Sequence, residues 1–354
     1  MSFVSSVILI DAPASALNNA GSVEGARTDN TIAVKRIQSA YGSFPYVSAQ
    51  AFRYWLRTTL EHTDSNWKAA PVHREGKIAY TDANPIQFWD DDLFGYMRAP
   101  SKKTDAKKAE GASPLEKDRD ITRVAPFRVS TFVSVSPVAV TSDFGTMTRQ
   151  EGDPVPYEHE FYKAHLVGSL SLDLSASGTF FDGERVGFRN LDSFRRDEAK
   201  KFELEETKSR KQKVFRLPLM QRQTRVHSLF SGIARIMGGA KQSLHYTDLT
   251  PAFISLTVTK FGNNPFQRFF TDRQRRTAFH REAFLESWAV YQDQLQSKLY
   301  VGWAQGFLDD ERRAFEEAIE SLPNKDRIEI VHPVTAIHNF LAELNDGINA
   351  QWYD

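Results

Sequence analysis

The 354-residue chain contains no cysteine. This absence excludes a disulfide framework and any thiolate metal site, and it fits a protein of the cytoplasm. No apolar run approaches the ~20 residues that a bilayer-spanning helix needs. Residues 1–13 have no basic segment before their apolar run and no small-residue cleavage pattern after it, so they predict a first strand and no signal peptide. We therefore expect a soluble, cytoplasmic protein.

Motifs of catalysis are also missing. The chain has no GxxxxGK[ST] phosphate loop, no GxGxxG, no HExxH and no GxSxG. Its nine histidines are scattered, and without a cysteine nucleophile covalent catalysis has no support. Asp90, Asp91 and Asp92 are consecutive, and successive side chains point in different directions, so we expect no metal site there. The sequence predicts no enzyme activity, no metal and no cofactor.

The net charge is zero, with 45 basic and 45 acidic residues, but the charges are unevenly distributed. Residues 195–241 hold thirteen Lys/Arg against five Asp/Glu, whereas residues 309–354 hold eleven acids against four basic residues. Such a chain can bind a polyanion with one face and a protein with another. The alternative is two solvated helical surfaces whose charge bias has no function.

Hydrophobic residues are plentiful, at 41% of the chain with 26 phenylalanines, and predict a large folded core in one domain or two. Period-two patterns predict strands, and apolar faces of period 3.6 predict helices. A polar loop of more than thirty residues follows the first strand, and the charged, low-complexity residues 100–120 predict a mobile loop. The expected strands cover residues 3–10, 128–140, 165–174 and 251–260. The expected helices cover residues 48–61, 213–237, 273–299, 311–322 and 335–348.

The helix at residues 48–61 has a distinctive polar side. Ser48 is placed to cap its N-terminus, and Gln50, Arg53 and Arg57 follow at helical spacing. No acid interrupts these donors before Glu61, which suits a negatively charged backbone. The alternative is an ordinary surface helix with a basic stripe.

Two further segments lie between the predicted elements. Residues 141–162 are too long for a tight turn and too aromatic for a plain solvent loop, so we predict a projecting β-hairpin with a polar tip. Gly238 and Gly239 follow the helix at residues 213–237 and would end it as a left-handed cap. Glycines also let a phosphate approach the backbone closely.

Two segments that lie far apart in the chain carry a family resemblance. A first strand, an Asn/Gly/Arg loop and the pattern V-S-x-Q-A-F-R-x-x-L-R run through Val47, Ser48, Gln50, Ala51, Phe52, Arg53, Leu56 and Arg57. A second block, RIMGGAKQS at residues 235–243, precedes the apolar strand at residues 251–260. Together they resemble the backbone subunits of CRISPR-associated Cascade complexes, the "Cas-seven" family, in its DevR-like type I branch. The resemblance covers about three quarters of the chain.

The resemblance implies an α+β fold with an RRM-like (ferredoxin-like βαββαβ) core, long insertions and a projecting β-hairpin called the thumb. The palm would comprise residues 1–270, with an insertion at 62–125 that contains the mobile loop and the thumb at 141–162. Residues 271–354 would form a C-terminal helical extension packed on the core. Ordinary RRMs carry an aromatic RNA-binding signature that this chain lacks, so loops, helix and hairpin would hold the RNA.

The implied function is a non-catalytic backbone subunit of a type I Cascade that polymerises along CRISPR guide RNA in antiviral defence. Its partners would be guide RNA, target DNA paired to the guide, neighbouring copies of itself and other Cascade subunits, with no membrane. Apolar thumb side chains would displace bases without reading them; these are Phe144, Met147 and Tyr157. The expected RNA-binding residues are Asn18, Asn19, Arg27, Lys35, Ser48, Gln50, Arg53, Arg57, Gly238, Gly239, Lys241 and Gln242.

Two other functions stay open at this point. Backbone subunits of the related type III effectors cleave target RNA with an aspartate in a loop after the first strand, and Asp29 lies in a comparable loop. Asp11 is a second carboxylate in this region. The remaining alternative is a monomeric protein that binds single-stranded RNA.

Overall fold

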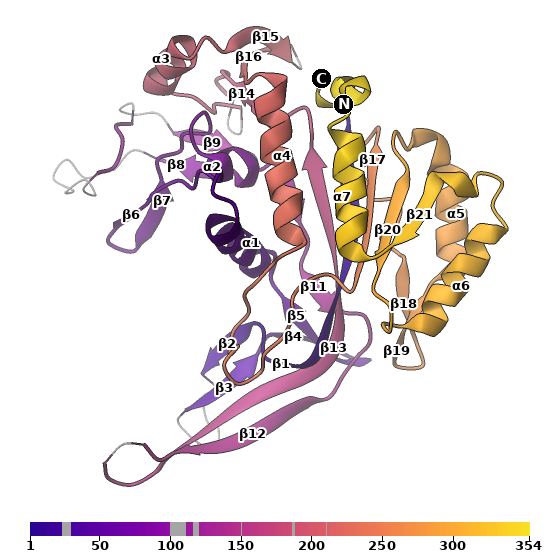
Figure 1. Ribbon diagram of the computed structural model, residues 1–354. Coiled ribbons are helices and arrows are strands. Elements are labelled where there is room, and N and C mark those ends of the chain that lie inside the picture. Colours follow the sequence, from indigo (N-terminus) through magenta and orange to yellow (C-terminus); the bar gives the residue numbers. More distant parts are fainter. Residues whose placement is uncertain (23–29, 100–110, 116–119, 150, 186–187, 210) are drawn as a thin grey trace.

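The computed structural model describes residues 1–22, 30–99, 111–115, 120–149, 151–185, 188–209 and 211–354. Across these ranges the fold is α+β, and twelve strands join in one large mixed sheet (Figure 1). The main path of this sheet is β21-β20-β17-β1-β13-β11-β5-β4, and β2, β3, β10 and β12 pair beside it. The strands are β1 (Phe3–Ser15), β2 (Asn19–Ser22), β3 (Thr31–Val34), β4 (Arg36–Ser39), β5 (Gly42–Val47), β10 (Phe127–Val129), β11 (Phe132–Ser134), β12 (Val140–Met147), β13 (Val155–Asp173), β17 (Phe253–Thr259), β20 (Leu299–Trp303) and β21 (Ile328–Val331).

Strands β1 and β13 form the centre of the sheet. β1 pairs antiparallel with β13 on one side and with β17 on the other, and β13 pairs antiparallel with β11. Alternate residues of β1 enter two different cores: Ile8 and Ile10 face one, whereas Val7 and Leu9 face the other. This alternation follows from the two-residue period of a strand and places a buried layer on each face of the sheet.

Three helices cover one face of the sheet, as Figure 1 shows. They are α1 (Ala49–Thr63), α4 (Leu219–Ile233) and α7 (Pro333–Leu344). Phe52, Phe230 and Phe340 bring their rings into the core under these helices. Along the chain, α1 lies between β1 and β11, and α4 lies between β13 and β17.

The opposite face carries an aromatic layer. It is built from β18 (Phe270–Arg273), β19 (Arg276–Phe279), α5 (Arg281–Tyr291), η1 (Gln292–Gln294), α6 (Asp309–Glu320) and η2 (Lys325–Arg327). Phe253 of the sheet lies 5.1 Å from the ring of Trp303 and 4.6 Å from that of Phe269. The C-terminal segment is therefore more than the helical extension that the sequence predicts, because β20 and β21 also extend the main sheet.

Smaller elements lie at one end of the molecule. They are β6 (Val72–Glu75), β7 (Ile78–Thr81), α2 (Trp89–Phe94), β8 (Tyr96–Arg98), β9 (Ile121–Arg123), β14 (Thr179–Phe181), α3 (Ser193–Lys201), β15 (Glu205–Ser209), β16 (Gln212–Arg216) and η3 (Gly347–Tyr353). Most of the mobile loop predicted at residues 100–120 lies outside the described residues.

The strands predicted at residues 3–10, 165–174 and 251–260 are confirmed, and so is the helix predicted at 48–61. Four other predictions are wrong. The helix predicted at residues 273–299 is limited to α5 at 281–291, because residues 276–279 pair with 270–273 in a hairpin and β20 begins at residue 299. The loop after the first strand contains β2 to β5, and residues 128–140 are not one strand but parts of β10, β11 and the start of β12. Pro137 has no backbone N–H and cannot continue a ladder. The helix predicted at 213–237 starts later, because residues 212–216 pair as β16 and α4 begins after Pro218.

Within the described residues, no helix is long and apolar enough to cross a bilayer.

Candidate nucleic-acid interface

Ser48 caps α1 as predicted. Its side chain accepts a hydrogen bond from the Ala51 amide at 3.3 Å, which satisfies one of the free N–H groups at the helix start. The Ser48 amide in turn donates to Oδ1 of Asn18 at 3.1 Å, and the Asn18 carbonyl accepts from the Lys35 amide at 2.8 Å. Asn18 and Ser48 therefore hold the loops around α1 together. Asn19 is half-buried, and its Oδ1 has no hydrogen-bond partner among the described residues.

Arg53 and Arg57 pack against the ring of Phe94. The guanidinium of Arg53 lies 5.3 Å from the ring centre and that of Arg57 lies 4.4 Å from it. Arg53 also donates to the Phe94 carbonyl. Burial, and secondarily the charge of Arg57, lowers the pKa of Arg53 to about 10. The two arginines thus join α1 to α2, and their stems are not free in solvent.

The basic side of α1 does have acidic neighbours, contrary to the sequence-based expectation. Burial lowers the pKa of Arg57, while the charges of Asp90, Asp91 and Glu61 act in the opposite direction. Helix α2 brings the first two of these carboxylates to Arg57, and no pattern within residues 48–61 could reveal them. Gln50 is exposed on α1, as is Tyr54 at 65%.

The three consecutive aspartates of α2 each have their own partners, as their directions predict. Asp90 accepts from the Ala70 amide at 2.8 Å, and Asp91 accepts from the Thr81 hydroxyl at 2.6 Å. Asp92 forms ion pairs with two arginines in the interior. Across the described part of the chain, no group of three His, Cys, Asp or Glu side chains could hold a metal ion.

Gly238 and Gly239 lie where the loop after α4 packs closely against α1 and the end of β1. Their φ angles are +146° and +95°, in the region that favours glycine. A Cβ on Gly238 would lie 2.5 Å from Cγ of Trp55, and one on Gly239 would lie 2.7 Å from Cδ2 of Leu17. The predicted capping role is wrong, because α4 ends at Ile233 and Ala234 is its C-cap. The glycines instead let the loop pack against α1 and against the end of β1.

The rest of this loop is held by its own side chains. Gln242 donates to the Gly238 carbonyl, and its Oε1 accepts from the Thr247 amide at 3.0 Å. Lys241 has a left-handed backbone, with φ of +52°, and its side chain is half-exposed. Gln242 therefore stabilises the loop, and Lys241 is a cation that the loop presents beside the hairpin.

The hairpin predicted at residues 141–162 is present. Strands β12 and β13 pair in register from Val140–Tyr162 to Met147–Val155, and Figure 1 shows them projecting from the sheet. Phe144 is 50% exposed and Met147 57% exposed. The ring of Tyr157 lies over Gly145, where a Cβ would come within 2.4 Å of its Cζ. Tyr157 thus covers the strand opposite it, whereas Phe144 and Met147 are accessible.

A histidine pair joins this hairpin to the loop after α4. Nε2 of His159 on β13 lies 2.8 Å from Nε2 of His245 in that loop. The His159 ring stacks on Tyr157 with centroids 6.0 Å apart, and the His245 ring stacks on Phe161 at 5.0 Å. Burial lowers the pKa of His159, helped by Lys241 and His245. At this distance one ring nitrogen donates a hydrogen bond to the other.

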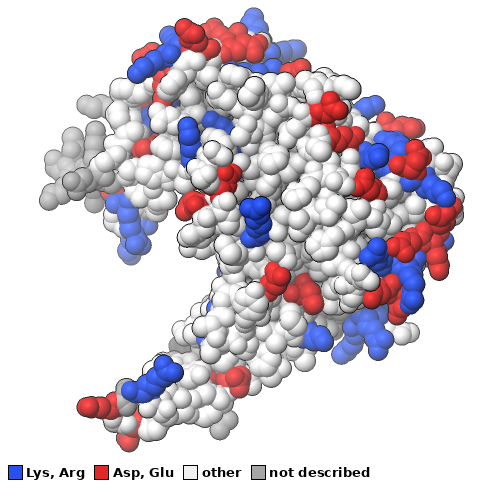
Figure 2. Space-filling model, viewed as in Figure 1, with Lys and Arg blue, Asp and Glu red and all other residues white. Residues whose placement is uncertain are grey.

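These segments border one concave surface. Figure 2 shows a hollow between the body of the molecule and the projecting hairpin. The loop with Lys241 reaches the hairpin through His245, and β3 pairs with β13 at Thr31–Glu158, which brings the N-terminal loops to the same place. The structure thus gathers Lys241, Gln242, Asn18 and the hairpin residues, although the sequence separates them. Arg27 and Asp29 lie outside the described residues.

Comparison of the chain with known proteins identifies its family. A family model described as CRISPR-associated negative auto-regulator DevR/Csa2 matches residues 9–275. The chain belongs to the DevR/Csa2 family. The match runs from within β1 to the turn between β18 and β19 and includes α1, the hairpin β12–β13 and the loop after α4.

Solved structures share the fold of this family member. A chain of a "CRISPR RNA-guided surveillance complex" aligns with a TM-score of 0.50 and 11% identity, over 96% of this chain and 99% of that one. A chain of a "CRISPR RNA-guided surveillance complex, pre-nicking" aligns with a TM-score of 0.53 and 10% identity, over the same shares. A search of curated proteins finds no match.

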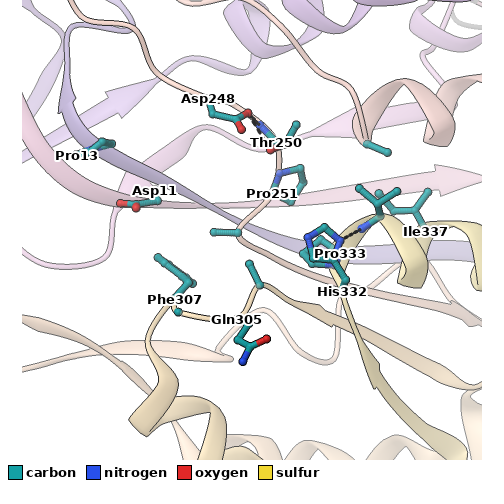
Figure 3. Close-up of a pocket in the computed structure, with 15 residues that line it drawn as sticks. Asp11, Pro13, Asp248, Thr250, Pro251, Gln305, Phe307, His332, Pro333 and Ile337 are labelled. Atoms are coloured by element: carbon teal, nitrogen blue, oxygen red, sulfur yellow. Dashed lines mark hydrogen bonds between the residues drawn. The ribbon is translucent and has the colours of Figure 1, made fainter.

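A second hollow of this DevR/Csa2 protein is a cleft of about 460 Å³ at the start of α7 (Figure 3). Asp11 lies at its edge, 3.6 Å from Nε2 of His165. The Asp248 carboxylate accepts hydrogen bonds from the hydroxyl and the amide of Thr250, at 2.8 and 2.9 Å. His332 accepts a hydrogen bond from the Val334 amide and so caps α7. Asp11, Asp248 and His332 of the cleft are therefore engaged in local structure.

Sequence reasoning did not assign a role to His159, His245 or Tyr246. The alternation of Tyr157, His159 and Phe161 was a signal, because side chains two apart share one face of a strand. Their partner His245 lies 86 positions away from His159, and only the fold brings the two together. Tyr246, 81% exposed beside this pair, is an aromatic ring on the surface of the loop.

Proposed function

We propose that this protein is a non-catalytic backbone subunit of a type I Cascade complex, which binds CRISPR guide RNA and polymerises along it. The guide's bases would stay free to pair with target DNA in antiviral defence. Neighbouring copies of this chain and other Cascade subunits would be its protein partners. Membership of the DevR/Csa2 family and the fold shared with surveillance-complex chains support this proposal.

An RRM-like core is part of the same proposal. The order β17-β1-β13-β11, with antiparallel neighbours, corresponds to strands 4-1-3-2 of a βαββαβ unit. Helices α1 and α4 lie between the required strands and on one face of the sheet. The palm would then be residues 1–270, the thumb would be the hairpin at 141–162, and the remaining elements would be insertions and additions.

The observation that carries the proposal is the meeting of three distant segments at the base of the hairpin. The Gly238–Gly239 loop packs on Trp55 of α1 and on Leu17, and its His245 contacts His159 of the hairpin. A single strand lying in the adjoining hollow would meet backbone N–H groups, polar side chains and a projecting apolar hairpin together. This combination suits an RNA that is held by its phosphates and not read by its bases.

The candidate residues divide by role within this proposal. Gln50, Lys35 and Lys241 would contact phosphates, and Phe144 and Met147 would separate bases. Asn18, Asn19, Ser48, Gln242 and the two glycines would shape the loops around the RNA, Tyr157 would brace the hairpin, and Arg53 and Arg57 would hold α1 against α2 while adding positive potential. Arg27 remains a candidate from the sequence alone.

Guide-RNA binding is tested with the Lys241→Gln variant, since Lys241 is half-exposed and lacks the packing that makes Arg53 and Arg57 structural. We expect weaker binding to every guide sequence alike, and a salt dependence whose slope falls by about 0.7 for the lost phosphate contact on a single strand. Lys325→Gln is the matched control, because Lys325 is half-exposed and pairs with Glu320 in the opposite layer. Binding is measured by fluorescence anisotropy at several salt concentrations.

The RNA that co-purifies with the protein separates the alternatives. RNA of uniform length with a repeat-derived end supports the Cascade assignment. A loss of binding confined to certain base sequences would contradict phosphate-driven binding. Metal-dependent cleavage of guide-complementary RNA, abolished in Asp29→Asn, would instead identify a type III-like nuclease.

A further inference from the structure

The hairpin β18–β19 carries an unusual concentration of positive charge. Arg273 and Arg276 are directly opposite each other across its two strands, and the two residues between them are Gln274 and Arg275. All four are exposed, and Arg268 is exposed just before the hairpin. Figure 2 shows positive charge at the lower right of the molecule, where Figure 1 places this hairpin.

Two features of the hairpin tip, residues 273–276, are unfavourable in the free protein. Like charges directly opposite on a strand pair repel each other. The turn residues Gln274 and Arg275 have φ angles of +53° and +62°, which a two-residue hairpin turn normally assigns to Asn-Gly. Neither feature is relieved within the described part of the chain, where no ion pair to these arginines is found. Asp272, the hairpin's own acid, lies opposite Thr277 in the adjacent register position.

The base of the hairpin is rigid, so the charged tip is held in place. Phe270 and Phe279 are buried in the aromatic layer, and their residues pair across the strands. The Phe279 amide donates to Glu311 of α6 at 2.7 Å. This layer covers the face of the sheet opposite to α1 and α4. The tip therefore belongs to a different surface from the loops and hairpin proposed to hold guide RNA.

We propose that the arginine tip of β18–β19 is a second nucleic-acid contact, which binds the phosphate backbone of a strand other than the guide. Guanidinium groups bind phosphate oxygens in a bidentate manner, and an anion between Arg273 and Arg276 removes their repulsion. A nucleic-acid strand carries a charge every ~3.4 Å along its axis, so it can neutralise several clustered arginines at once. Its binding needs no base recognition, which suits a contact made at every copy.

The test replaces both opposed arginines, as Arg273→Gln with Arg276→Gln, in the full chain with its co-purified RNA. The probes are single-stranded DNA and duplex DNA of about 30 nucleotides, and we expect the salt slope to fall by about 1.4 on the single strand and about 1.8 on the duplex. The thermal midpoint should stay equal or rise, because the repulsion is removed. The control Arg313→Gln with Lys325→Gln removes the same charge from exposed, ion-paired positions in the same layer and should change neither slope.

The outcomes separate this inference from the proposed function. Unchanged retention of co-purified RNA together with the lower DNA slopes supports a second contact. A loss of the co-purified RNA instead would place the tip in the guide site and overturn the inference. Unchanged salt slopes for DNA would also overturn the inference. If self-association fell while the slopes stayed unchanged, the tip would bind an acidic protein surface instead of DNA. None of these results affects the Lys241 test of guide-RNA binding.

Discussion

Asp92 is the carboxylate that balances the buried arginines around α2. Its side chain is fully buried and forms ion pairs with Arg123 and, at 2.7 Å, with Arg225 of α4. It also accepts from the Gly178 amide at 3.0 Å. One carboxylate thus joins α2, β9, α4 and the turn before β14. In the sequence alone, Asp92 is only the third of three consecutive acidic residues.

Asp92→Asn should destabilise the protein by about 3–5 kcal/mol, because both buried arginines lose their counter-charge while the shape of the side chain is kept. Urea unfolding followed by circular dichroism measures this change. Asp310→Asn is the control, since its exposed pair with Arg313 is worth at most ~1 kcal/mol. A loss below 1 kcal/mol for Asp92→Asn would mean that the pairs add little beyond their hydrogen bonds.

Asp91 provides a pH-dependent term of stability. Burial raises its pKa from 3.8 to about 6, so between these values the folded protein keeps a proton that the unfolded chain has released. Its contribution is fully present below pH 3.8 and is lost as the pH rises through about 6. Relative to Asp91→Asn, the wild type should lose about 2 kcal/mol of stability between pH 4 and pH 7, because part of the ~3 kcal/mol total is already lost at pH 4. Urea unfolding of both proteins across this range gives the difference, and a constant difference would contradict the raised pKa.

The hairpin β12–β13 is the element on which the proposed function depends most. Replacing residues 145–157 by an Asn-Gly turn keeps His159 and its contact with His245. The deleted part includes exposed side chains such as Met147 and Val155, so the thermal midpoint should stay within a few degrees of the native value. Ordered polymerisation and protection of guide RNA from nucleases should be lost.

Both properties of the shortened protein are measured together, by thermal unfolding and by nuclease digestion of the co-purified RNA. Unfolding of the shortened protein would show that the hairpin is part of the core. Regular filaments with protected RNA would refute its role as a thumb.

Elements with one strong local signal were predictable from the sequence. The short apolar run around Ile8 and the cap at Ser48 locate β1 and α1 because each depends on neighbouring residues alone. The strands β2 to β5 were missed since they are short and polar, and pairing with distant partners stabilises them more than their own composition does. The end of α4 was misplaced because Gly238 looks like a cap and is instead a packing site for Trp55.

At the scale of the whole molecule, the sequence predicted the class of the fold but not its second layer. The α+β class and the projecting hairpin followed from periodicity and from the family pattern. The aromatic layer around Phe253 and Trp303 depends on contacts between segments far apart in sequence, which periodicity does not reveal. The residues of the candidate site stay a prediction from separate segments, and the contact of His159 with His245 that joins these segments depends on the same long-range folding.

Strand β13 belongs to both the hairpin and the main sheet, so the backbone continues from one into the other. Its 19 residues run unbroken from Val155 near the tip to Asp173 beside β1. Adding two residues to each arm of the hairpin would lengthen its reach by about 7 Å and keep every side chain on its face, whereas adding one would exchange the two faces beyond that point. The length of the hairpin can therefore change without exchanging its faces only in steps of two residues per arm. A series of such insertions would measure the distance that the hairpin must span between its binding partner and the main sheet.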